Sequence, residues 1–169
     1  MIFSGLRTVF SDPREHQLVK NTLLTTLPRL GKEWKISFQF NPTNYNFTDW
    51  TNLVHLTVGG NMEKYGDRIP AIFFKPDRGL LVSSSINGKS NNYVRTRVPP
   101  PPVNQWTTIT VSQIRSDCAY IFKVEVNGEE AWAMENSQAR DFSSVKVYTS
   151  DPFFNAHPGS IRAFTIVTQ

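Results

Sequence analysis

Alternation of apolar and polar residues is the dominant pattern in this chain beyond its first thirty residues. Residues 34–40 read Trp-Lys-Ile-Ser-Phe-Gln-Phe, and residues 120–126 repeat the pattern. A two-residue period is typical of a strand with one buried face. Asn127-Gly128 then predicts a two-residue type I′ turn, with residues 129–134 returning antiparallel. The further predicted strands are residues 53–58, 71–75, 79–86, 93–98, 107–113, 145–149 and 161–168.

Short strands at this spacing predict an all-β fold, an antiparallel β-sandwich of two sheets packed face to face. Asn87-Gly88 predicts a second hairpin. The four prolines 99–102 supply no hydrogen-bond donors for a ladder, so they are expected outside the central strands, as a polyproline connector. No repeat of 20 to 50 residues is visible, which argues against solenoids and propellers.

Residues 11–27 fit two structures equally well. Asp12 with Glu15 three residues later resembles a helix capping box, whereas Thr22, Thr25 and Thr26 favour extended backbone. We expect a loop or a short helix here, followed by a strand near Leu23.

Length and composition predict one soluble globular domain over residues 1–169. The chain is 39% hydrophobic and 19% charged, and it has no apolar run near the ~18 residues of a membrane span. Its net charge of +4 comes from scattered basic residues. Cys118 is the only cysteine, so there is no intrachain disulfide.

The N-terminal residues give limited information on compartment. They lack the long apolar segment of a signal peptide, so we expect a mature, intracellular or excised chain. The triplet Asn46-Phe47-Thr48 would accept a glycan in a secreted protein, although such triplets are common by chance.

Four segments in order resemble the concanavalin A-like lectin and glucanase superfamily, in particular its laminin G-like jelly-roll domains. They are residues 23–40, 104–111, 122–128 and 158–164, and the resemblance spans residues 23–168. It implies a sandwich of curved sheets, an extracellular location, and relatives that bind sugars, glycosaminoglycan-like polymers or proteins. Some of these relatives use calcium and some are glycosidases, so the fold does not select the function.

Enzyme signatures are absent from the sequence. Glycosidases of this architecture carry Glu-x-Asp-x-x-Glu on one strand, which this chain lacks; Glu125 and Glu129-Glu130 flank a predicted turn instead. There is no Gly-x-Ser-x-Gly elbow, and Cys118 has no histidine near it in sequence. Among the histidines, His55 has opposite parity to its apolar neighbours, which favours a hydrogen-bonded or solvent-facing side chain. The galectin signature is also missing, so we predict a protein that is not an enzyme.

The loop 59–70 is the first predicted ligand site. Amides and carboxylates can hydrogen-bond to vicinal hydroxyls, an arginine supplies a fork of donors, and a tyrosine ring offers a flat face to a sugar. The same side chains could equally brace the loop. The predicted ligand-binding residues in this loop are Asn61, Tyr65, Asp67 and Arg68.

The loop 150–159 is the second predicted ligand site. Adjacent phenylalanines in a turn cannot both point inward by strand alternation, so one is expected to cover the core and the other to be exposed for a ligand or partner. The alternative is that both rings cap the end of the sandwich. The predicted ligand-binding residues here are Asp151, Phe153, Phe154 and Asn155.

Calcium is an alternative ligand if the two loops meet, because Ca²⁺ takes six to eight oxygen donors. Asp67 and Asp151 are the candidate metal ligands, with Asn61 and Asn155 as further donors. Asn87 lies near the hairpin comparable to the calcium loop of laminin G-like domains, but it is not acidic. No cofactor is indicated with certainty.

These observations predict a lectin-like, non-enzymatic binding module that recognises glycan or glycoprotein through rim loops. Alternatives are an adhesion domain that binds protein and, third, a polysaccharide-active glycosidase. Tyr93, Arg95 and Arg97 share one predicted strand face and could contact an anionic polysaccharide or, as the weaker alternative, nucleic acid. Edge strands of such sandwiches often pair, so a homo-oligomer is compatible with the pattern.

Overall fold

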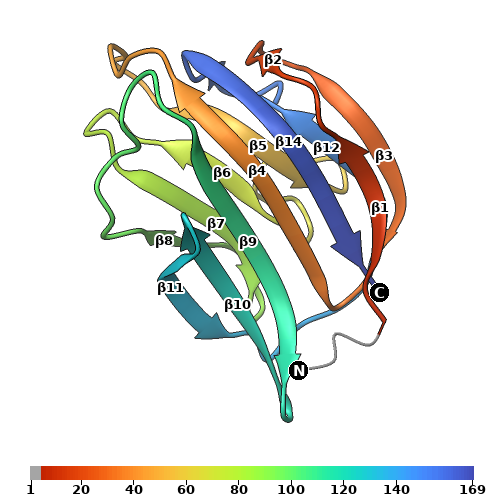
Figure 1. The fold of residues 1–169 in the computed structure, drawn as a ribbon. Coiled ribbons are helices and arrows are strands. Elements are labelled where there is room, and N and C mark those ends of the chain that lie inside the picture. Colours follow the sequence, from red (N-terminus) through yellow and green to blue (C-terminus); the bar gives the residue numbers. More distant parts are fainter. Residues whose placement is uncertain (1–4) are drawn as a thin grey trace.

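A computed structural model describes residues 5–169, in which fourteen strands form two seven-stranded sheets that face each other (Figure 1). In order across sheet A lie β1 (Arg7–Asp12), β14 (Gly159–Thr168), β4 (Trp34–Pro42), β9 (Thr107–Ser116), β10 (Ala119–Val126) and β11 (Glu129–Glu135), with β2 (His16–Gln17) paired to β14. In order across sheet B lie β3 (Leu23–Leu30), β12 (Phe142–Thr149), β5 (Thr51–Thr57), β6 (Ala71–Phe74), β7 (Leu80–Ile86) and β8 (Lys89–Arg95), with β13 (Asn155–Ala156) parallel to β5.

The predicted all-β antiparallel sandwich is therefore confirmed, and its core follows from the alternation in sequence. The apolar residues of β4 are buried to 3% exposure or less, while Lys35 is exposed. From the opposite sheet, Phe74 meets Phe40 with ring centroids 5.7 Å apart. Burying side chains of this size contributes about 1.5–3 kcal/mol each, which makes this interface the main source of stability.

Both predicted Asn-Gly turns are present. Asn127 and Gly128 have φ of 51° and 81°, and Asn87 and Gly88 have 55° and 79°, as a type I′ turn requires. Because this turn is tight, Lys89 pairs directly with Ile86, and β8 runs over Lys89–Arg95, earlier than the predicted 93–98.

The expected loop or short helix between residues 11 and 27 is the clearest difference. Residues 7–12 and 16–17 are extended and pair with β14 instead. Phe10 packs edge-on against Phe164 of β14 with ring centroids 6.0 Å apart, and this contact stabilises the extended form. The Asp12 carboxylate binds Arg14 and His16, at 2.9 Å and 2.7 Å, and so holds the turn between β1 and β2 where the sequence suggested a helix cap. These contacts with Arg14 lower the pKa of Asp12.

Sheet B is buried on both faces in its centre. Every residue of β5, β6 and β7 is buried. On the face turned away from sheet A, here called the outer face, Ala71, Phe73 and Leu81 form a separate apolar cluster with Trp50 and Phe154. We call these five residues the outer cluster. Besides the segment that carries Trp50, the two loops in which the sequence placed the ligand site lie over this face.

Candidate ligand-binding site

The loop 59–70 is folded around the carboxylate of Asp67. One Asp67 oxygen accepts the backbone N–H of Lys64 at 2.8 Å, and Asp67 is only 3% exposed. Gly60 packs so closely on this carboxylate that a Cβ there would collide with it. The Thr57 hydroxyl donates to the Gly60 carbonyl at 2.7 Å. Asp67 thus braces the loop. This was the alternative to direct sugar contact in the sequence analysis.

Arg68 fastens the loop to the outer face. Its Nε donates to the Asn61 carbonyl at 3.0 Å, and one terminal nitrogen donates to Asn91 Oδ1 at 2.8 Å. The guanidinium lies 4.8 Å over the ring of Phe73, and the residue is 4% exposed. Burial lowers the pKa of Arg68, while the nearby carboxylates of Asp151, Glu63 and Asp67 act in the opposite direction.

The loop 150–159 is organised by a second buried carboxylate, that of Asp151. One of its oxygens accepts the N–H groups of Phe153 at 3.0 Å and Phe154 at 2.8 Å. This turns the two rings apart. Phe154 is half-buried, 5.0 Å from Phe73, while Phe153 remains 41% exposed. The Phe154 ring thus lies on the sheet, whereas the Phe153 ring is partly exposed with its centroid 5.9 Å from that of His55.

His55 of β5 joins the two loops. Its Nδ1 lies 2.7 Å from Asp151 Oδ2 and its Nε2 lies 2.6 Å from the Asp67 carbonyl oxygen. A carboxylate oxygen of one loop and a main-chain carbonyl oxygen of the other thus lie within hydrogen-bond distance of the two nitrogens of one imidazole ring. The side chain is completely buried. Hydrogen bonding of His55 was predicted, but its link between loops was not.

Tyr65 lies apart from the other predicted site residues. Its hydroxyl donates to the Gln138 carbonyl at 2.8 Å and its ring stacks on Phe142 at 6.1 Å. The guanidinium of Arg140 covers the ring at 3.9 Å. Burial raises the pKa of Tyr65. The ring therefore faces β12, whereas Asn61 and Arg68 face β6 and β8.

The exposed groups around the outer cluster come from several elements. Phe153 and Asn155 are exposed on one side, and Met62 is 43% exposed on the other. Tyr93 of β8, 64% exposed, completes the set. Sequence reasoning missed Phe73 and Trp50 as the floor of this surface. A signal existed, because the unbroken apolar run of residues 71–74 is typical of a strand buried on both faces.

The two candidate metal ligands do not fit a shared calcium site. Both carboxylate oxygens of Asp151 have hydrogen-bond partners within the protein, and Asp67 Oδ2 accepts the Lys64 backbone N–H. In the described part of the chain, no three His, Cys, Asp or Glu residues are grouped to hold a metal ion.

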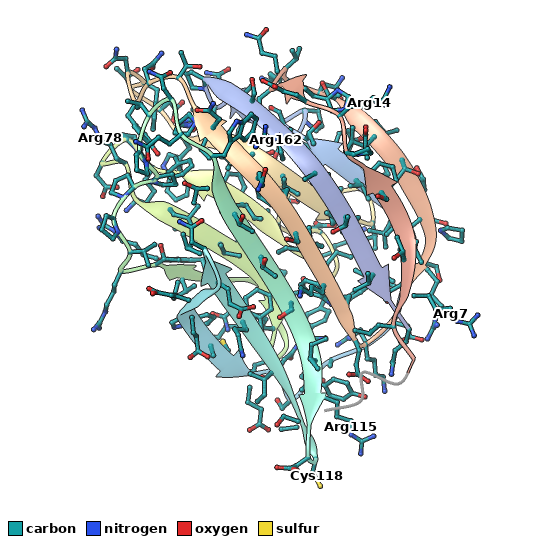
Figure 2. The ribbon with its side chains drawn as sticks, in the orientation of Figure 1. Arg7, Arg14, Arg78, Arg115, Cys118 and Arg162 are labelled. Atoms are coloured by element: carbon teal, nitrogen blue, oxygen red, sulfur yellow. The ribbon has the colours of Figure 1, made fainter. Side chains whose placement is uncertain are left out.

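The remaining nucleophile and base candidates lie away from this surface. His157 is buried among the rings of Phe40, Tyr45 and Phe74, with Nδ1 2.8 Å from the Thr51 hydroxyl. Burial lowers the pKa of His157 to about 4, so the ring is neutral near pH 7. Cys118 is exposed in the turn between β9 and β10, at the lower tip in Figure 2.

No protein-family model matches this sequence, and no curated protein matches it. Solved structures share the fold. The CBM40 domain of the Ruminococcus gnavus IT-sialidase, bound to α2,3-sialyllactose, has a TM-score of 0.56 at 13% identity, over 93% of this chain and 91% of that one. The receptor-binding domain of botulinum neurotoxin type G has a TM-score of 0.56 at 11% identity, over 98% of this chain and 41% of that one.

A putative carbohydrate-binding protein of Bacteroides ovatus has a TM-score of 0.54 at 12% identity, over 95% of this chain and 42% of that one. This chain thus spans less than half the length of the neurotoxin and Bacteroides chains. At these identities the likeness establishes the β-sandwich architecture. Residues 5–169 contain no helix with the length and hydropathy needed to cross a membrane.

Proposed function

We propose that this protein is a non-enzymatic carbohydrate-binding module that holds glycan on the outer face of sheet B, between the loops 59–70 and 150–159. One observation carries the proposal: the ring of His55 hydrogen-bonds to both loops, at 2.7 Å and 2.6 Å, and so fixes a polar and aromatic rim on a rigid sheet. Binding sites supported in this way keep their geometry without a ligand.

The predicted site residues then divide into two groups. Phe153 and Asn155 are exposed and Asn61 is half-buried, so these side chains are positioned to contact a sugar. Phe153 supplies a flat apolar face and the two amides supply donors and acceptors. Asp67, Arg68 and Asp151 are buried and support the rim, Phe154 forms part of its floor, and Tyr65 supports the loop 59–70 from the β12 side.

The absence of a catalytic role is supported by the carboxylates. Glycoside hydrolysis needs one carboxyl group that gives up a proton and another that acts as nucleophile or base. Asp67 and Asp151 are both occupied by hydrogen-bond donors below the surface. Glu129 and Glu130 are exposed beside the turn that joins β10 and β11. The carbohydrate-binding proteins that share this fold support the same conclusion.

The finer classification follows from the sequence resemblance. We assign the chain to the concanavalin A-like, laminin G-like group, acting outside the cell as one domain over residues 1–169. A shallow rim with one exposed ring gives weak affinity at a single site, so useful retention requires several copies or several sites on one polymer. Adhesion to glycoproteins is the role consistent with that arrangement.

The test is a Phe153→Ala variant on a glycan array. Loss of the only exposed ring on loop 150–159 is expected to weaken glycan binding at least tenfold, about 1.4 kcal/mol, with little change in stability. Leu23→Ala is the matched control, because Leu23 is 49% exposed on β3, outside both loops. Retention of full glycan binding by Phe153→Ala would reject this rim as the site.

Recognition of a protein partner is the second candidate function. Tyr93 is 64% exposed on β8, an edge strand of sheet B, which would suit a protein partner. Binding to a glycoprotein is measured before and after enzymatic removal of its glycans. Binding that persists after deglycosylation would favour the protein alternative over the glycan.

A further inference from the structure

A concave site lies where the turn between β6 and β7 meets the end of β8. It is a cavity of about 430 Å³, in the size range of small-ligand pockets. Three arginines, Arg78, Arg95 and Arg97, line it together with one carboxylate, Asp77. We call it the arginine pocket. None of the eight residues predicted as ligand-binding lines it.

The local backbone is built to present these guanidinium groups. Arg78 has φ of 68°, a left-handed conformation in which a long side chain is rare and which costs about 1–2 kcal/mol. A Cβ on Gly79 would lie 2.9 Å from Asp77 Oδ1 and 3.0 Å from Arg95 Nε, so a side chain there would push these two groups from their present positions. The glycine thus admits the ion pair between Asp77 and Arg95, 3.0 Å apart.

The proline run forms a wall of the pocket. Pro100 lines the cavity, and the Tyr45 hydroxyl donates to the Pro101 carbonyl at 2.7 Å, which fixes the run in place. The Arg78 guanidinium lies 6.0 Å from the Tyr45 ring. The four prolines 99–102, a bland connector in sequence, therefore give one side of the pocket a stiff boundary.

Positive charge in the pocket exceeds the negative charge that could neutralise it. Asp77 is already engaged by the Gly79 amide, Lys75 and Arg95, at 2.9 Å, 3.7 Å and 3.0 Å. Over residues 5–169, Arg78 and Arg97 form no ion pair. Two exposed guanidinium groups without a carboxylate partner, beside a third, favour an external anion.

The arginine pocket lies next to the outer cluster, because Arg95 of the pocket pairs with Leu81 of the cluster across β7 and β8. Trp50 lies edge-on to Phe73 at 6.1 Å, and Lys75, next to the pocket, lies 5.9 Å from the Trp50 ring. The pocket and the His55 end of the site are separated by the length of β6, whose four residues span about 10 Å. An extended chain of sugars can therefore reach both.

We propose that the arginine pocket binds a sulfate or carboxylate group of an acidic glycan whose sugar rings lie on the outer face of sheet B. This inference rests on the proposed function and names its ligand class. Guanidinium groups form paired hydrogen bonds to the oxygens of both anions, which explains why arginine rather than lysine fills this pocket.

The test compares two double variants of equal charge. Arg78→Gln with Arg97→Gln removes the two unpaired cations of the pocket, and Arg95 is left in place because it pairs with Asp77. Arg7→Gln with Arg115→Gln removes two exposed arginines elsewhere. Figure 2 shows Arg78 at the upper left and both control positions at the lower right.

The probes are matched polymers, dextran sulfate against dextran and polygalacturonate against its methyl ester, with affinity measured by calorimetry at two salt concentrations. The wild type is expected to bind a charged polymer, less strongly at high salt, and to bind its neutral counterpart more weakly. The pocket variant is expected to lose at least tenfold in affinity, while the control variant loses less than threefold. Which of the two charged polymers binds shows whether the pocket accepts a sulfate or a carboxylate group.

Equal losses in both double variants would overturn the inference, because they would show general attraction to polyanions. Absence of wild-type binding to either charged polymer would also overturn it, while the Phe153-dependent binding of neutral glycans would still stand. If the wild type bound no carbohydrate of either kind, the proposed function would fail and the inference with it.

Discussion

The outer faces of the two sheets differ, although both belong to sheets of the same size. The outer face of sheet A carries polar side chains, such as Lys35, Ser37 and Gln39 of β4, with Arg162 stacked 3.9 Å over Trp106. The outer face of sheet B is apolar at its centre, and two loops cover it. A strict polar–apolar alternation thus marks a face left to solvent, whereas an apolar residue at every position marks a face that needs a cover.

The loops over sheet B are held from below by a completely buried carboxylate, that of Asp151, and Asp151→Ala is the substitution expected to disrupt them most. The variant leaves His55 without its carboxylate and removes the acceptor for two backbone amides. Breaking a buried pair in this way costs about 3–5 kcal/mol, so urea unfolding is expected at a much lower midpoint.

Asp141→Asn is the control for that measurement. Asp141 pairs with Arg29 at 2.6 Å, but both side chains are about half exposed. Such a pair contributes about 0–1 kcal/mol. Comparable losses in the two variants would contradict the role of Asp151 as the frame of its loop.

The buried ring of His157 provides a test based on pH. His157 packs among apolar rings, and its pKa falls from 6.5 to about 4 on folding. Between these values the unfolded chain binds a proton that the folded chain does not, so stability decreases as pH falls from about 6.5 to 4. The loss is of the order of 2–3 kcal/mol. The variant His157→Phe is expected to flatten this part of the curve of unfolding free energy against pH.

Measuring both proteins at each pH isolates the contribution of His157, because the other titrating groups are shared. Parallel curves for the wild type and His157→Phe would show that another group dominates acid unfolding.

The smallest effect is expected on the outer face of sheet A. Arg162→Ala removes a cation–π contact with Trp106 and a 2.7 Å hydrogen bond to Gln39. Both Arg162 and Trp106 are half-buried, and losing such a contact costs about 1 kcal/mol. Glycan binding should be unchanged. A loss of binding would indicate that the glycan lies on sheet A and would contradict the proposed site on sheet B. Thermal unfolding and the glycan array provide the two readings.

Much of the fold could be predicted because strand periodicity and turn chemistry are local. Residues 34–40 carry their own alternation, and Asn127-Gly128 tolerates the positive φ that its turn needs. The extended form of residues 7–17 could not be predicted in the same way. It depends on Phe10 meeting Phe164, a residue more than 150 positions away.

For the candidate site, the sequence indicated which loops to consider but not how most of their side chains lie. The composition of residues 59–70 and 150–159 marked both loops, and the split between Phe153 and Phe154 followed from their adjacency. The inward position of Arg68, and the turning of Tyr65 toward Phe142, depend on which strands lie beneath each loop. That information is in the strand order of sheet B, which no local pattern encodes.

The bridging ring of His55 has a consequence for how this surface can change. The ring of His55 is held by Asp151 and the Asp67 carbonyl, so exposed residues of each loop, such as Met62 or Asn155, can be substituted while these two contacts remain. New binding preferences can then be acquired by substitution at these exposed positions without refolding the support, in evolution or in a designed library. Because His55 contacts both loops, a substitution that displaces one loop is also expected to alter the position of the other.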